Sequence, residues 1–147
     1  SEIRKNSPEA VFRSNFIVGY PGETEEDQDE LIDFVKEMQL DWCGFFPFSD
    51  EEGTYASGLE GKVDRALIIE RLKELSSLQD AITSSKRDVL IGERISVLVD
   101  SLGVGRTYRE APEIDGIVCV PESCEVGEFA DLIVKGALGP DLEAELI

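Results

Sequence analysis

Hydrophobic and polar positions in the first part of the chain follow the order of a strand and then a helix. The apolar, partly β-branched residues Val11, Phe12, Phe16, Ile17 and Val18 predict a strand that is covered on both faces. Gly19-Tyr20-Pro21-Gly22 is typical of a turn that ends such a strand. Apolar residues within 25–39 then recur at helical spacing, and Thr24 is the expected N-cap.

The same alternation occurs a second time. Residues 42–48, WCGFFPF, predict another buried strand, and residues 49–63 predict a polar, glycine-punctuated loop. Asp64 is expected to cap a long helix that runs to about residue 88. Strands that alternate with helices favour an α/β arrangement with parallel strands. The predicted buried stripe of the long helix consists of Ile68, Leu72, Leu75, Leu78 and Ile82.

The pattern changes at Ile91-Gly92, where the helical period gives way to alternation with a period of two. ERISVLVD predicts a half-buried strand. Five short strands within about 55 residues predict a small closed β-barrel of the OB kind. We therefore expect two parts, 1–91 and 92–147. The other four strands are predicted around 104–108, 116–120, 129–135 and 141–147.

Charge narrows the classes of partner. The chain has 14 basic and 32 acidic residues and a formal net charge of −18. This balance argues against free-standing RNA or DNA binding, which depends on basic contacts to phosphate, and favours a basic protein as partner. An acidic surface that serves only solubility is the alternative. The absence of a long apolar run and of a signal-peptide pattern predicts a cytoplasmic protein without a membrane segment.

The cysteines do not form a metal-binding pattern. Cys43, Cys119 and Cys124 are scattered, and the chain has no histidine. We expect three reduced cysteines, with Cys119 in the core of a strand, and no metal site.

Three segments carry a family resemblance. FIVGYPGETEED, FSDEEGT and GRTYREAPEIDGIVCV occur in this order, joined by a long helix. The chain thereby resembles the C-terminal portion of radical-SAM methylthiotransferases: residues 1–91 resemble the end of the radical-SAM (βα) barrel with its linking helix, and residues 92–147 resemble the TRAM domain. It is most similar to the branch that modifies an aspartate of a small-subunit ribosomal protein.

The resemblance implies a specific chemistry. A four-iron four-sulfur cluster cleaves S-adenosylmethionine, the resulting radical abstracts hydrogen from the aspartate β-carbon, and a second such cluster helps to install the methylthio group. The cysteines that hold both clusters in this family are absent from this chain. The resemblance therefore implies a fragment that works with a missing N-terminal part, has no catalytic residue of its own, and is inactive in isolation.

The resemblance also implies positions near S-adenosylmethionine. The first strand and its turn should flank the cofactor. The loop after the second strand should face the same open end of the barrel. The alternative is an ordinary strand and turn in which Glu23 only complements the helix dipole. The implied cofactor-binding residues are Asn15, Ile17, Gly19, Glu23, Ser49, Gly53 and Thr54.

A basic and aromatic cluster in the second part is the candidate for docking the ribosomal protein. It comprises Arg106, Tyr108 and Arg109, followed by Asp115. The alternative is that the local acids pair with these arginines around a turn at residues 111–113.

Two other functions compete with this assignment. A tRNA adenosine methylthiotransferase shares the same modules but must attract phosphate, whereas residues 92–147 hold 12 acids and 4 bases, a net charge of −8. A non-catalytic OB-type adaptor that docks proteins is the third candidate.

Overall fold

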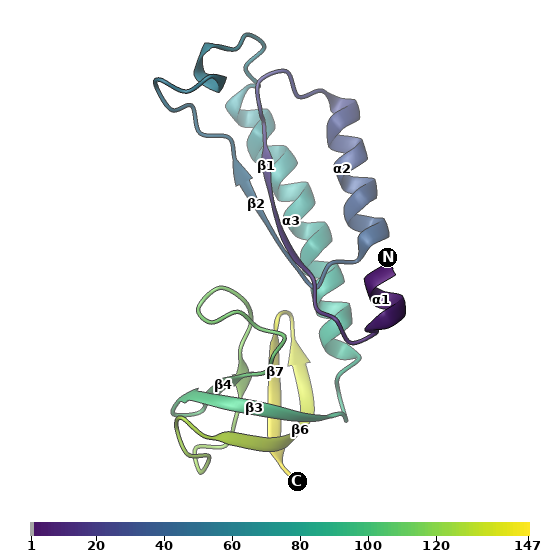
Figure 1. Cartoon of the computed structure of the whole chain (residues 1–147), viewed down its shortest axis with the longest axis vertical. Coiled ribbons are helices and arrows are strands. Elements are labelled where there is room, and N and C mark those ends of the chain that lie inside the picture. Colours follow the sequence, from purple (N-terminus) through teal and green to yellow (C-terminus); the bar gives the residue numbers. More distant parts are fainter. Residues whose placement is uncertain (1) are drawn as a thin grey trace. The chain divides into compact units, whose positions relative to one another are not determined.

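The computed structural model describes residues 2–147, which form two compact units (Figure 1). The first unit extends to Gln79 and the second runs from Asp80 to Ile147. The first contains α1 (Glu2–Asn6), β1 (Arg13–Val18), α2 (Glu25–Met38), β2 (Trp42–Pro47), the short 3-10 helix η1 (Ala56–Gly58) and most of α3 (Arg65–Asp88). No helix within residues 2–147 is long and apolar enough to cross a membrane.

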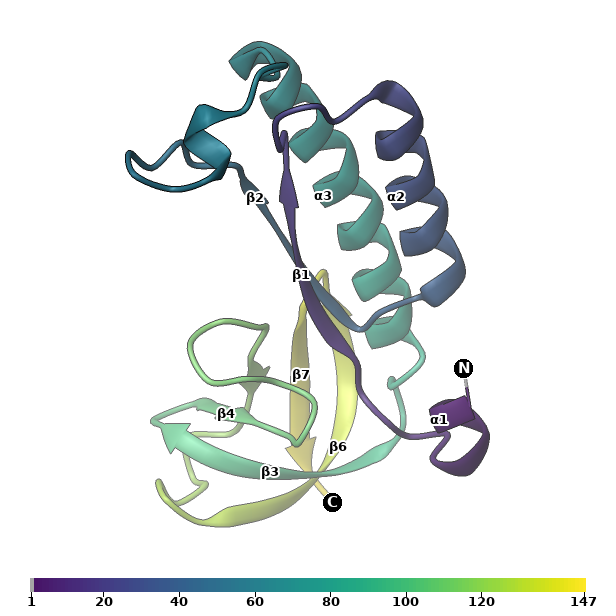
Figure 2. The same cartoon turned by 45° about the horizontal axis from the view of Figure 1, so that its top comes forward.

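The two strands of the first unit pair in parallel, as the alternation of strand and helix predicts. α2 and α3 run alongside the β1–β2 pair (Figure 2). The Phe34 ring of α2 packs edge to face on the Phe16 ring of β1, with 5.8 Å between the ring centres. Phe16 also stacks on Phe45 of β2. The buried apolar side chains of this unit include Val18, Ile32, Val35, Leu40, Ile68 and Leu75.

The prediction that the strands are covered on both faces is wrong for this chain. Burial alternates along β1, and the side chains of Ile17 and Phe46 remain 63% and 53% exposed. Register pairs these two residues on the same face, opposite the face on which α2 packs. Adjacent apolar residues such as Phe16, Ile17 and Val18 show that apolar side chains point to both faces of a strand, but not that both faces have neighbours.

Both predicted helix caps are present. Thr24 Oγ1 accepts a hydrogen bond from the Asp27 backbone N–H at 3.2 Å, and Asp27 Oδ2 accepts one from the Thr24 N–H at 2.8 Å. The bond from the Thr24 backbone N–H, and after it the bond that the Thr24 hydroxyl donates to Asp27 Oδ2 at 3.0 Å, hold the pKa of Asp27 below its usual value. Asp64 Oδ1 accepts from the Ala66 N–H at 2.8 Å at the start of α3. The predicted stripe also holds: Ile68, Leu75 and Ile82 are buried.

The second unit contains the end of α3 and the closed five-stranded barrel that the sequence predicts. Its strands are β3 (Arg94–Ser101), β4 (Val104–Arg106), β5 (Val118–Cys119), β6 (Phe129–Leu138) and β7 (Asp141–Leu146). They are ordered β3-β4-β5-β7-β6, and every pairing is antiparallel except β5 with β7. β5 is shorter than predicted because the Ile117 N–H donates to Asp141 Oδ1 and Gly116 lies against the Pro140 carbonyl.

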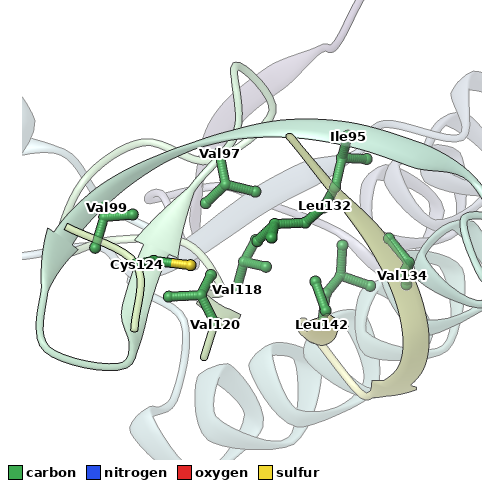
Figure 3. Close-up of a cluster of buried hydrophobic side chains, with 10 residues drawn as sticks. Ile95, Val97, Val99, Val118, Val120, Cys124, Leu132, Val134 and Leu142 are labelled. Atoms are coloured by element: carbon green, nitrogen blue, oxygen red, sulfur yellow. The ribbon is translucent and has the colours of Figure 1, made fainter. Parts of the chain in front are cut away.

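The barrel core consists mainly of alternate side chains from its strands, together with Val120 and Cys124 from the segment between β5 and β6 (Figure 3). Cys124 belongs to this core, whereas Cys119 is exposed on β5 between the buried Val118 and Val120. The prediction that Cys119 is a core residue is therefore wrong. The buried cluster comprises Ile95, Val97, Val99, Val118, Val120, Cys124, Leu132, Val134, Leu142 and Ala144.

Candidate functional site

A hollow of about 450 Å³ lies at the carboxyl ends of β1 and β2. Two of the predicted cofactor residues, Gly19 and Ser49, line it together. Its volume is within the range of small-molecule sites. Parallel strands of α/β folds present their ligands at this end, which makes the hollow the candidate site of the first unit. Its apolar wall is formed by Pro21, Pro47, Phe48, Val63, Ile68, Ile69 and Leu72.

The polar part of the hollow contains three residues that sequence reasoning missed. Asp50, Lys62 and Arg65 line it, and Lys62 Nζ forms an ion pair with Asp50. Lys62 and Arg65 are the only basic residues between Lys36 and Arg71. Two cations isolated in an acidic stretch of sequence are a pattern from which their role in the site could have been predicted. They give the site two cations and one carboxylate, a set that can bind a ligand with both carboxylate and ammonium groups.

Gly19 has a left-handed backbone conformation and lies too close to Ile68 for any residue with a side chain. Its φ is +84°, in the left-handed region that favours glycine, and a Cβ atom at this position would lie 2.4 Å from Ile68 Cδ1. Its backbone N–H donates to Glu23 Oε2 at 2.8 Å. The turn therefore brings the chain directly against α3.

Glu23 lies between the turn and α3. Its second carboxylate oxygen, Oε1, is 2.6 Å from Arg71 Nη1, and Arg71 Nη2 reaches Glu25 Oε1 at 2.5 Å. The Arg71 side chain is only 3% exposed. Glu23 thus holds the Gly19 turn in place, a role that requires Arg71, which sequence reasoning also missed because the two residues are far apart in the chain.

The remaining predicted cofactor residues do not line the hollow. Asn15 lies beside Gly44 on the same face of the strand pair as Ile17. Gly53 and Thr54 lie in the loop after β2, where Thr54 Oγ1 donates to the Glu51 carbonyl at 2.8 Å. The structure therefore brings Gly19 and Ser49 together in the lining of the hollow. Glu23 contacts Gly19 from outside the lining, through its bond to the Gly19 N–H.

No group of three His, Cys, Asp or Glu residues within residues 2–147 is arranged to hold a metal ion. Cys43 is half-buried, and burial raises the pKa of its thiol to about 11, which disfavours the thiolate that a metal requires. Cys119 is exposed and Cys124 is in the barrel core. These residues do not fit an iron–sulfur cluster.

The structure separates the predicted docking residues of the second unit into different roles. Arg106 Nη1 is 3.2 Å from Asp100 Oδ1 of β3, so its partner is not one of the acids that follow it in the chain. The Arg109 guanidinium carbon lies 4.3 Å from the centre of the exposed Tyr108 ring. Asp115 Oδ2 accepts from the Ala111 N–H at 2.7 Å and stabilises the turn.

A buried ion pair anchors this loop. Glu110 Oε1 lies 2.5 Å from Arg87 Nη1, and both side chains are almost fully buried. Glu110 Oε2 accepts from the backbone N–H and the hydroxyl of Thr107, each at 2.7 Å. Tyr108 and Arg109 are therefore presented from a fixed loop, and the pair that fixes it is not detectable in the sequence pattern.

Comparison with known proteins defines the class of the second unit: residues 91–147 match the TRAM domain family. Over almost its whole length the chain is similar to ribosomal protein uS12 methylthiotransferases. It is 45% identical to the Thermotoga petrophila protein over 139 residues, which is 92% of the chain and 32% of that relative. It is 41% identical to the Cutibacterium acnes protein over 147 residues, 97% of the chain and 31% of the relative.

The Akkermansia muciniphila methylthiotransferase is 42% identical over 143 residues, 97% of the chain and 32% of the relative. The chain thus spans about a third of the length of these relatives. The resemblance to methylthiotransferases that the three sequence segments indicate is confirmed, as is the TRAM domain.

Proposed function

We propose that this chain is part of an enzyme that adds a methylthio group to the β-carbon of an aspartate in ribosomal protein uS12. The observation that carries the proposal is the similarity to uS12 methylthiotransferases over 92–97% of the chain. In this assignment residues 1–91 are the last part of a radical-SAM barrel and residues 92–147 dock the protein substrate. The parallel strands with a hollow at their carboxyl ends support the first assignment.

The hollow fits S-adenosylmethionine in the chemistry of its lining. Asp50, which pairs with Lys62 in this structure, would offer a carboxylate to the ammonium group of the cofactor. Lys62 and Arg65 would offer cations to its carboxylate, and the apolar wall would suit its adenine. The chemistry that the cofactor would supply there is radical abstraction of hydrogen. Gly19 and Ser49 would line the site, and Glu23 would keep the Gly19 turn against α3.

The iron–sulfur clusters of such an enzyme do not fit the residues of this chain, so their ligands must come from another part of the protein. We therefore expect the isolated chain to be inactive. After incubation with iron, sulfide and a reductant it should show no cluster absorbance and no cleavage of S-adenosylmethionine. Incorporation of a stoichiometric cluster with cofactor turnover would contradict the proposal.

The partner follows from the relatives and from charge. The relatives are named for uS12, a ribosomal protein, and such proteins carry basic surfaces that bind RNA. The net charge of −8 on residues 92–147 would attract a basic protein and repel the phosphates of tRNA. This balance favours a protein substrate over the tRNA substrate of the sibling enzymes.

A chimera tests the proposal. The matching third of the Thermotoga petrophila relative would be replaced by this chain, and the reconstituted chimera would be incubated with uS12 and S-adenosylmethionine. Peptide mass spectrometry should find the methylthio group on an aspartate of uS12. A chimera that folds and carries its clusters, yet modifies a tRNA anticodon stem-loop instead of uS12, would show that the tRNA-modifying assignment is correct.

A further inference from the structure

The outer face of β3 and β6 carries a row of side chains that the barrel core does not use. Strand register places Leu98 beside Phe129, and Ser96 beside Asp131. The next row along the strands pairs Arg94 with Ile133. We name the surface formed by Arg94, Ser96, Leu98, Phe129 and Asp131 the β3–β6 face.

Phe129 is an exposed aromatic residue with an apolar neighbour. Its side chain is 72% exposed, and its cross-strand partner Leu98 is half-buried. Directly paired residues in antiparallel strands have Cβ atoms about 5 Å apart, so the Phe129 and Leu98 side chains form one apolar patch on the surface. Aromatic residues of this kind are enriched among the anchors of protein interfaces.

A hollow of about 280 Å³ adjoins this apolar patch on the same face. Arg94, Ser96, Asp131 and the terminal Ile147 contribute to its lining. Asp131 is two residues from Phe129 along β6, which in a strand is about 7 Å. An extended partner chain has the same repeat, so it can place one side chain on Phe129 and the side chain two residues further on at Asp131.

The charges of the face select a basic partner. Asp131 forms no ion pair with another residue in the part of the chain that the structure describes, and Glu128 precedes Phe129. Arg106, whose β4 position pairs with Leu98, is held by Asp100. Arg94 lies one row beyond Asp131, so a cation on the Phe129 side of the hollow meets the carboxylate before it meets the guanidinium.

We propose that the β3–β6 face docks an extended basic segment of the protein substrate, with an apolar side chain on Phe129 and Leu98 and a Lys or Arg side chain at Asp131. This inference rests on the proposed function, in which the substrate is uS12. Burial of the Phe129 ring supplies most of the affinity, and the charges supply rate of encounter and selectivity.

Titration of the 147-residue chain with purified uS12 at low and physiological salt tests this surface. Phe129→Ala should weaken binding about tenfold, the loss typical of an interface anchor. Asp131→Asn should weaken it about threefold and reduce its salt dependence, because a charge contact is screened by salt. Arg94→Ala should leave binding equal or tighter. Leu138→Ala, which alters an 82% exposed residue of the same strand, and Glu143→Gln are matched controls expected to stay within about twofold.

Circular dichroism melting would confirm that each variant folds, as expected for exposed positions. Equal binding by wild type, Phe129→Ala and Asp131→Asn would overturn the surface assignment while leaving uS12 as partner. No binding of uS12 to the wild-type chain would overturn both the surface and the proposed partner. Tighter binding of a tRNA anticodon stem-loop that is lost in Arg94→Ala would show that the face binds phosphate instead.

Discussion

Arg71 is the residue on which the turn after β1 depends. Its guanidinium is buried and bridges Glu23 and Glu25, while Glu23 in turn accepts the Gly19 N–H. Arg71→Met should lower the free energy of unfolding of the first unit by about 3 kcal/mol, because it leaves the mostly buried Glu23 carboxylate without its cation. Urea denaturation followed by the fluorescence of Trp42, the single tryptophan, measures this loss.

The matched control for that experiment is Lys36→Met. Lys36 also forms an ion pair with an acid, Asp33, but both side chains are largely exposed to solvent. Removal of such a pair changes stability by about 0.5 kcal/mol or less. Equal losses in the two variants would contradict a supporting role for Arg71.

The three cysteines should react with iodoacetamide at very different rates. Cys119 is exposed and should be modified first, whereas Cys124 in the barrel core should react only after unfolding. The pKa of Cys43 is raised to about 11 by burial, so its thiolate fraction at pH 8 is about one in a thousand. Because the thiolate is the nucleophile, modification of Cys43 should accelerate about a hundredfold between pH 8 and 10.

Peptide mass spectrometry after timed alkylation distinguishes the three sites. Modification of Cys43 at pH 8 as fast as that of Cys119 would contradict the burial of the Cys43 thiol.

At the scale of elements, the close contact between the β1 turn and α3 depends on a single glycine. Gly19 and Gly22 both have positive φ, +84° and +90°, but only at Gly19 would a Cβ atom collide with another side chain, that of Ile68. Gly22→Ala should cost about 1 kcal/mol from backbone strain. Gly19→Ala should cost about 3 kcal/mol, because overpacking against α3 adds to the same strain.

Urea denaturation monitored through Trp42 fluorescence measures both losses. A double variant that also carries Ile68→Ala should recover part of the Gly19→Ala cost, since the smaller side chain makes room for the new methyl group. Additive losses would show that the two residues do not clash.

At the scale of the whole molecule, the two units differ in how their strands are completed. The barrel closes on itself, which leaves no open edge, whereas the sheet of the first unit has only two strands within residues 2–147. Short open sheets exchange backbone protons through local opening. We expect ladder amides of β3, β6 and β7 to exchange about a hundredfold more slowly than those of β1 and β2.

Hydrogen exchange measured by NMR on the whole chain gives these rates residue by residue. Equal protection in the two units would show that the first is a self-sufficient domain. The inferred position of the first unit, as the last part of a larger barrel, would then lose its physical support.

The sequence by itself determined the elements whose signals are local. Thr24 and Asp64 cap helices through hydrogen bonds to residues two or three positions away, so a short window contains all of the information. The period of two in ERISVLVD likewise predicted β3, because neighbouring side chains of a strand point to opposite faces. The three segments that indicate the methylthiotransferase family are also local patterns.

Only the tertiary structure decided which side chains of those elements contact one another and which of them are buried. Arg71 reaches Glu23 across 48 positions of the chain, and no periodicity encodes such a contact. Cys119 and Val120 both lie in an apolar run, so only closure of the barrel decides which of them points inward. Local hydrogen bonds and periodicity fix the elements, whereas partners distant in the chain fix burial and the lining of the site, because only folding sets those distances.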